Sequence, residues 1–492
     1  MGQPKAGLLH RLRGDTDMFD ATLPSSLEAL LVGLAPCFTR PGFDTFATLV
    51  TGWVACPGRH SISRVIQAAS GGPAHEKHHS SFYRFLSHGS WAVDALGEVL
   101  LHLLLPWLPQ QVTLILDDTL CHKSGPHLFG AAMHYDTHAS TYGRGTSQGR
   151  QSFFAFGHNW VVAAVWLPLP WNPARGLALP LLIRLYRSKK RCPAGRYRKR
   201  TEMAAELVKL VAGWLPAGRP LLVVADREYA CKTLLRHLPP NVSFTGPMTM
   251  DAALYDQAGP YSGRGRRRLK GERLDTPKEL AARTSTPWKK LTLTIHGREV
   301  TLLVKVQHAP WYTVAGTQRL SVVVTRDPAS RLSDRAFFST EDENSESDTL
   351  IQFARRWEIE VAFRNTKQVM GLEDPQNGWW RRKAGSPRPQ KRPGPNPRGR
   401  RGETTVNHTL MLVFTAYALV VLWYLKHGNR ENDVARVRSE APWYRHKQTV
   451  SFPDMLAAPR REIWIARLSR HPLLKRVRDK IDNLMPQWLL AA

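Results

Sequence analysis

One short segment of the sequence places a carboxylate and three cations at helical spacing. Residues 353–367 read FARRWEIEVAFRNTK, with Glu360 four residues from both Arg356 and Arg364, and Lys367 three residues further on. On a helix these side chains lie on neighbouring turns. A carboxylate among cations suits a site that binds a metal ion on one side and phosphate groups on the other. The alternative is a solvated row of salt bridges, the usual role of Glu and Arg at this spacing.

Two apolar runs upstream end in aspartate and supply further carboxylates. VTLILDD ends in Asp117 and Asp118, and PLLVVAD ends in Asp226. Both runs have the length and β-branched content of short buried strands that stop at acid, although a single strand-end aspartate can also be a turn or a helix N-cap. Together with Glu360 they form a set that could hold two divalent metals for phosphoryl transfer. Adjacent strand residues point to opposite faces, so Asp117 and Asp118 both stay candidates, with Asp117 favoured because it directly ends the apolar run.

These motifs resemble those of the DDE transposases of bacterial insertion sequences, in the branch with a Tyr-Arg-Glu-Lys signature. Arg356, Glu360 and Lys367 match that signature, while Phe353 stands at the tyrosine position and lacks the hydroxyl. Asp226 begins an Asp-Arg-Glu turn like the second-aspartate motif of that family. The similarity extends over residues 62–423. It implies metal ligation and catalysis by Asp117 or Asp118, Asp226 and Glu360.

The resemblance implies a mixed α/β fold with a ribonuclease-H-like core. A β-rich insertion would interrupt the core, with a helical N-terminal domain before it and a helical C-terminal tail after it. The expected parts are a helical DNA-binding domain at 1–108, the first half of the core at 109–245, the insertion at 246–345, the second half at 346–425 with a basic loop at 381–401, and a basic helical region at 426–492.

Hydrophobic periodicity predicts the elements that must position these residues. Helical patterns occupy 26–33, 63–69, 93–105 and 201–215, and strand patterns occupy 112–116, 159–167, 220–226, 290–295, 300–306 and 320–325. Alternation of strands and helices after residue 109 favours a mixed sheet.

The charge of the chain points to a polyanionic partner. The 492 residues carry a net charge of +29, an electrostatic footprint typical of proteins that bind nucleic acid. Basic segments at 187–200, 264–273 and 381–401 are either solvated loops or phosphate contacts, and phosphate contacts would make binding steeply salt dependent. The resemblance implies double-stranded DNA as partner, both the terminal inverted repeats of the element and the target DNA, bound by a homodimer.

Cysteine usage and hydropathy bear on the cellular compartment. The five cysteines are scattered without CxxC pairing, which favours a reducing cytoplasm, and with DNA as partner we expect a nucleoid-associated protein. The apolar run at 410–425 is short for a membrane span, so a buried core helix is expected there and no membrane partner. A membrane-associated basic protein anchored by this run is the rival interpretation.

The resemblance also implies a chemistry. Two Mg²⁺ ions, or Mn²⁺ in their place, would activate water for DNA cleavage and strand transfer, with hairpin ends as one route. Arg356, Arg364 and Lys367 would contact phosphates, since none of them is a base at neutral pH. Trp311 could stack on an extruded base, the alternative being core packing. A catalytically silent DNA-binding protein descended from a transposase is the second functional hypothesis, for which Phe353 is a hint.

Overall fold

The structure is a computed structural model that describes residues 24–69, 76–124, 128–136, 153–261, 263, 265–375 and 399–468. The chain divides into two compact units. One unit, here called the helical unit, contains residues 1–103, 125–129 and 365–492. The other, here called the sheet unit, contains residues 104–124 and 130–364. Most of the expected basic loop, and the C-terminal residues after 468, lie outside the described residues.

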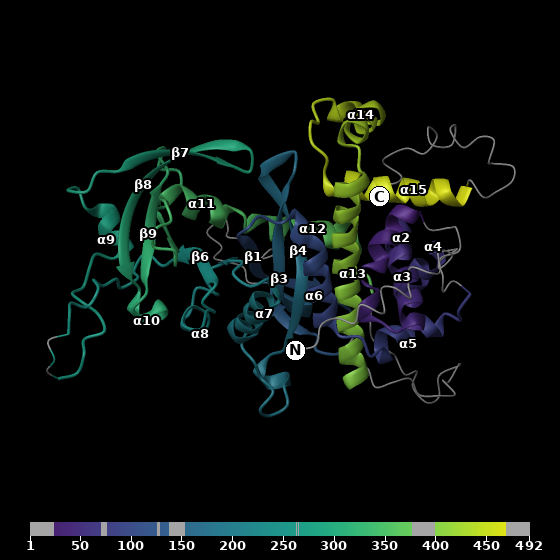
Figure 1. Cartoon of the computed structure of the whole chain (residues 1–492), viewed down its shortest axis with the longest axis horizontal. Coiled ribbons are helices and arrows are strands. Elements are labelled where there is room, and N and C mark those ends of the chain that lie inside the picture. The colour runs from purple at the N-terminus through teal and green to yellow at the C-terminus, as the bar shows by residue number, and fades with distance from the viewer. Residues whose placement is uncertain are drawn as a thin grey trace. The chain divides into compact units, whose positions relative to one another are not determined.

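The sheet unit is built on one mixed sheet of ten strands (Figure 1). The strand order is β2-β3-β1-β5-β6-β10-β9-β8-β7, and β4 pairs with β3 outside this path. β1 is parallel to β5, and β5 to β6, whereas the other pairs are antiparallel. The strands are β1 Val112–His122, β2 Ala132–Tyr135, β3 Phe154–Leu169, β4 Asn172–Tyr186, β5 Leu221–Ala225, β6 Val242–Met248, β7 Lys289–Ile295, β8 Arg298–Pro310, β9 Arg319–Arg326 and β10 Arg335–Ser339.

The central strands confirm the mixed α/β fold expected from the sequence and correct one boundary. β5 ends at Ala225, directly before Asp226, as predicted. β1 does not stop at the acidic pair but continues through it to His122. The reason is its antiparallel pairing with β3, which runs from Leu114 opposite Val165 to His122 opposite Gly157 and provides partners for the backbone beyond the aspartates.

The three strands predicted between Asp226 and Glu360 are β7, β8 and β9, which Figure 1 shows side by side. β7 and β8 are joined by a two-residue turn, His296 and Gly297, both with positive φ, the geometry that suits the twist of a hairpin. The sequence did not indicate β10, which pairs with both β9 and β6 and so joins this hairpin region to the central strands. A small buried cluster including Val304, Val323 and Phe337 stabilises it.

Helices of the sheet unit flank these strands. They are η2 Leu105–Trp107, η3 Lys189–Arg191, α7 Arg200–Trp214, α8 Lys232–Leu235, α9 Pro277–Ala282, α10 Tyr312–Ala315, α11 Glu346–Ala354 and α12 Trp357–Gln368, the last of which continues into the helical unit. The helix predicted at 201–215 is confirmed by α7.

The signature segment forms two helices rather than one continuous helix. α11 ends at Ala354 and α12 begins at Trp357, with Arg355 and Arg356 at the junction. Glu360, Arg364 and Lys367 lie on α12 at the expected helical spacing, whereas Arg356 precedes this helix at the junction, where the chain turns.

The helical unit confirms the predicted N-terminal helices and contains others. Its members are α2 Ser25–Val32, η1 Ala35–Cys37, α3 Arg40–Ala55, α4 Ile62–Ala68, α5 Ser80–His88, α6 Val93–Leu104, α13 Arg400–His427, α14 Arg430–Glu440, η4 Pro442–Tyr444 and α15 Phe452–Leu468. The helix α13 is long and apolar enough to cross a membrane by length and composition, but 94% of its most apolar window is buried inside the protein. This matches the buried core helix expected at 410–425.

Candidate active site

The two parallel strands β1 and β5 bring two aspartates to neighbouring positions. Leu116 of β1 pairs with Ala225 of β5, so Asp117 and Asp226 follow at the next position of the same register. Paired residues of parallel strands point to the same face of a sheet. Asp117 is buried, with 8% of its surface exposed, whereas Asp226 is exposed just beyond the strand end. The buried carboxylate of Asp117 and the exposed carboxylate of Asp226 thus follow the same register position of two neighbouring strands.

The junction between α11 and α12 adds an arginine and a glutamate to this point. Arg356 Nη1 lies 2.7 Å from Asp117 Oδ2 and 3.5 Å from Glu360 Oε1. Burial raises the pKa of Asp117, Arg356 opposes that rise, and the charges of Glu360 and Asp118 add to it, so that the pKa reaches about 8. Glu360 and Asp118 thus place further negative charge beside Asp117, an arrangement that attracts cations.

Asp118 points to the opposite face of β1, where its partners are polar. Its Oδ2 accepts hydrogen bonds from Asn159 Nδ2 at 2.8 Å and Arg200 Nη1 at 3.2 Å. Arg200 also forms two 2.8 Å hydrogen bonds with Glu228, two residues after Asp226. The hydroxyl of Tyr229 is buried nearby and has no hydrogen-bond partner among the residues that the structure describes. Burial, followed by the charges of Asp118 and Asp117, holds the pKa of Tyr229 well above the usual range.

The donor chemistry of Asp117, Asp226 and Glu360 fits a divalent cation, because Mg²⁺ and Mn²⁺ prefer carboxylate oxygens. Burial is the largest cause of the raised pKa of Asp117, and a cation bound beside this side chain would favour its charged form. Among the residues that the structure describes, no three His, Cys, Asp or Glu side chains form a closed metal-binding group. Arg356 instead lies between two of the carboxylates, so a metal that binds there must displace its guanidinium.

The remaining predicted residues lie in different surroundings. Arg364 is exposed on α12, and Lys367 at the end of that helix lies 3.8 Å from Glu373 within the helical unit. Trp311 precedes α10, is 7% exposed and packs edge-on against Phe338, so core packing accounts for its ring, and base stacking by Trp311 stays a prediction. Phe353 packs against Phe337 in the hydrophobic cluster of the hairpin region.

Two contacts near the site were not anticipated from the sequence. Arg355 donates a 2.7 Å hydrogen bond from Nη1 to Thr113 Oγ1 of β1 and lies over the ring of Trp166 of β3 at 4.3 Å. Arg355 and Arg356 therefore attach the start of α12 to the sheet on which Asp117 lies. The only sequence signal was the pair of adjacent arginines, which does not reveal their partners.

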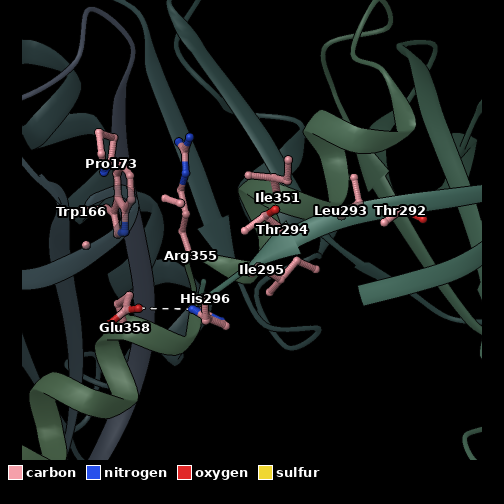
Figure 2. A pocket seen from close by; sticks show the side chains of 13 residues that line it. Trp166, Pro173, Thr292, Leu293, Thr294, Ile295, His296, Ile351, Arg355 and Glu358 are labelled. Carbon is pink, nitrogen blue, oxygen red and sulfur yellow. Dashed lines mark ion pairs between the residues drawn. The ribbon is translucent and has the colours of Figure 1, made fainter. Parts of the chain in front are cut away.

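A cavity of about 410 Å³ lies beside this junction, between Trp166, Arg355 and the tip of the β7–β8 hairpin (Figure 2). Figure 2 shows His296 at the hairpin turn facing Glu358 in the first turn of α12, and their side chains lie 3.3 Å apart. The hairpin tip and the helix that carries Glu360 are thus in contact at one edge of the cavity.

The family model described as DDE superfamily endonuclease matches residues 33–314, which include Asp117, Asp118 and Asp226. No curated protein sequence matches the chain.

Proposed function

The chain belongs to the DDE superfamily of endonucleases, whose model matches more than half of it, and from this premise we propose that it is a DNA transposase. The proposed reaction cuts the ends of an insertion sequence and joins them to target DNA. The substrate is double-stranded DNA, namely the terminal inverted repeats of the element and the target. The net charge of +29 supports a polyanionic substrate such as double-stranded DNA.

The observation that carries the proposal is the position of Asp117 and Asp226 next to each other on parallel strands, with Arg356 between Asp117 and Glu360. We assign these three carboxylates as metal ligands and catalytic residues, with Asp117 favoured over Asp118 because Asp118 faces Arg200 and Asn159 instead. Two bound Mg²⁺ or Mn²⁺ ions would supply an activated water and stabilise the attacking and departing oxygens.

The basic residues of α12 receive a separate role in the proposal. Arg356, Arg364 and Lys367 would hold phosphates, because a guanidinium and an ordinary ammonium cannot accept a proton at neutral pH. For Arg356 this requires that its guanidinium leave Asp117 when DNA and metal bind. The exposed position of Arg364 makes it accessible to a DNA backbone. Strand transfer would follow at the same site, with the freed 3′-hydroxyl as nucleophile and hairpin ends as a possible intermediate.

We further place the chain in the Tyr-Arg-Glu-Lys branch, with a ribonuclease-H-like core. The order β4-β3-β1-β5-β6, antiparallel on one side of β1 and parallel on the other, supports such a core. The helices before residue 108 would recognise the terminal repeats, and a homodimer would hold two DNA ends. A location at the nucleoid would follow from this substrate.

The experiment that tests the proposal is cleavage of labelled DNA that carries the ends of the element, in Mg²⁺ and in EDTA. Glu360→Gln should abolish cleavage while DNA binding persists. Glu358→Gln is the matched control, because it makes the same change on the same helix at a residue that faces His296. Loss of cleavage in both variants would indicate damage to α12 rather than removal of a ligand.

A catalytically silent DNA-binding protein is the second candidate. It is favoured by Phe353, whose ring packs on Phe337 and has no hydroxyl to offer a phosphate. Salt-sensitive DNA binding by the wild-type protein without cleavage in Mg²⁺ or Mn²⁺ would establish this candidate in place of the transposase.

A further inference from the structure

Two aromatic side chains of the helical unit are exposed side by side. Trp443 and Tyr444 belong to the short helix η4 and expose 77% and 55% of their surfaces. Their ring centroids lie 6.4 Å apart with an angle of 56° between the planes. Large aromatic side chains usually bury most of their surface, and adjacent exposed ones are typical of binding surfaces.

Hydrogen bonds stabilise the turn that carries Trp443 and Tyr444. Pro442 begins η4, and the backbone N–H groups of Tyr444, Arg445 and Lys447 donate to carbonyls three residues back. Arg438 of α14 donates a 2.7 Å hydrogen bond from Nε to the Lys447 carbonyl, which fixes the end of the turn. A rigid turn loses little conformational entropy when a ligand stacks on its rings.

Three cationic residues, Arg438, Arg445 and Lys447, lie close to the two rings along the chain. Arg438 and Arg445 are exposed, and neither has an acidic partner among the described residues. Arg445 Nε contacts only the ring of His446, at 3.1 Å. Lys447 lies 5.7 Å from the centre of the Tyr444 ring, although Asp454 neutralises it at 2.6 Å. The surface therefore combines free positive charge with open aromatic faces.

We propose that Trp443, Tyr444, Arg438 and Arg445 form a second nucleic-acid contact that binds unpaired DNA bases. Aromatic rings stack on the faces of bases that are not covered by neighbours, and guanidinium groups bind the adjacent phosphates. Duplex DNA buries these base faces, so the surface should distinguish single strands from duplexes. The inference rests on the proposed function, which makes DNA the polyanion that this chain meets.

A second copy of the chain is a poorer fit to this surface. Two copies meeting here would bring Arg438 and Arg445 of each chain together without acidic partners, and like charges at an interface oppose association. Single-stranded DNA supplies both the negative charge and the flat apolar surface that the four side chains require.

The test uses the full chain with a labelled oligo-dT strand and with a matched duplex. Trp443→Ala with Tyr444→Ala should weaken single-strand binding about tenfold, with the slope of affinity against salt unchanged, and leave duplex binding within about twofold. Arg445→Ala should reduce that slope by about one unit. Phe154→Ala is the matched control, since it removes a comparably exposed aromatic ring from strand β3. Cross-linking by a bromodeoxyuridine strand should label the peptide that contains Trp443.

Unchanged single-strand affinity in the double variant, or cross-links that avoid residues 438–447, would overturn the inference. A change in sedimentation of the double variant, with DNA binding intact, would overturn it in favour of a surface between protein copies. If the wild-type chain binds and cross-links as expected but cleaves no DNA in either metal, the transposase proposal fails while this surface stands. If the wild-type chain cleaves DNA normally but the double variant binds single strands as well as the wild type, the transposase proposal stands and this surface is ruled out.

Discussion

Arg356 donates a 2.7 Å hydrogen bond to the carboxylate of Asp117, and the same guanidinium nitrogen lies 3.5 Å from Glu360. One cation therefore joins a strand carboxylate to a helix carboxylate at the point where a metal would bind. Asp117 is buried, and its pKa is raised by burial in spite of Arg356. Arg356 and a divalent metal ion would compete for the same carboxylate oxygens. Either cation could balance the negative charge of Asp117 and Glu360.

Replacing Arg356 by alanine should lower the stability of the metal-free protein by about 2 kcal/mol, because Asp117 and Glu360 lose their shared counter-charge. Mn²⁺ should then raise the Tm of this variant more than that of the wild type, since the metal no longer has to displace a guanidinium. Thermal unfolding with and without Mn²⁺ measures both effects. Arg364→Ala, on the exposed side of the same helix, is the control. An equal rise in Tm on addition of Mn²⁺ in Arg356→Ala and Arg364→Ala would rule out competition between Arg356 and the metal.

The substitution Asp117→Asn should abolish DNA cleavage. The expected loss of cleavage rate is well beyond the roughly 10- to 100-fold typical of residues that only support a ligand. Asparagine at position 118 should reduce cleavage within that smaller range, because Asp118 accepts hydrogen bonds from Asn159 and Arg200 on the other face of β1. Single-turnover cleavage rates, with DNA binding measured in parallel, separate the two. A larger loss at position 118 would reverse the assignment of the first aspartate.

The sequence predicted the central strands because buried strands are long apolar runs, as in 221–225. It did not predict that β1 continues past its aspartates, since that depends on pairing with β3, whose residues lie far along the chain. The break between α11 and α12 was missed for a similar reason. Arg355 gains Thr113 and Trp166 as partners only once the sheet exists, and local spacing alone favours an unbroken helix.

The candidate site shows the same division between local and long-range information. Residue types and spacing were enough to select Asp117, Asp118, Asp226 and Glu360 as candidates. The parallel register of β1 and β5 places Asp117 level with Asp226, whereas Asp118 accepts hydrogen bonds from Asn159 and Arg200, and this long-range pairing cannot be read from a single strand. The contacts of Arg200 with Asp118 and Glu228 join three segments of the chain. No periodic pattern in the sequence predicts such contacts.

Replacing Arg460 by methionine should destabilise the helical unit by about 3 kcal/mol. Arg460 is 2% exposed, and its guanidinium donates to the carbonyls of Val54 at 2.6 Å and Cys56 at 2.8 Å, at the end of α3. Methionine fills similar volume but leaves these buried carbonyls without donors. Urea unfolding followed by circular dichroism measures the loss. Arg64→Met, at an exposed position of α4, should change stability by less than about 0.5 kcal/mol, and an equal effect of both would contradict the capping role.

Two buried histidines should make the helical unit sensitive to acid. Burial lowers the pKa of His60 and of His408 from 6.5 to about 4, and the charge of Arg460 contributes at His60. His408 stacks on Trp91 with centroids 3.7 Å apart, and within the described residues the buried Nδ1 atoms of both histidines have no hydrogen-bond partner. Protonation of either ring would therefore place a charge in a largely buried environment, and at His60 the carboxylate of Asp374, 4.0 Å from Nδ1, offsets part of that cost.

The sign of the pH dependence follows from these directions. Between pH 6.5 and 4 the unfolded chain binds protons at these histidines that the folded chain does not, so the free energy of unfolding falls as the pH falls. Above pH 6.5 both states are neutral and the contribution is constant. Each histidine can account for roughly 3 kcal/mol over the full window, at about 1.4 kcal/mol per pKa unit. Urea unfolding at pH 8 and pH 5 should show a smaller difference for His408→Gln than for the wild type. His102→Gln, at an exposed position, should keep the wild-type difference, and if His408→Gln keeps it too, the buried imidazole is not the source of the acid sensitivity.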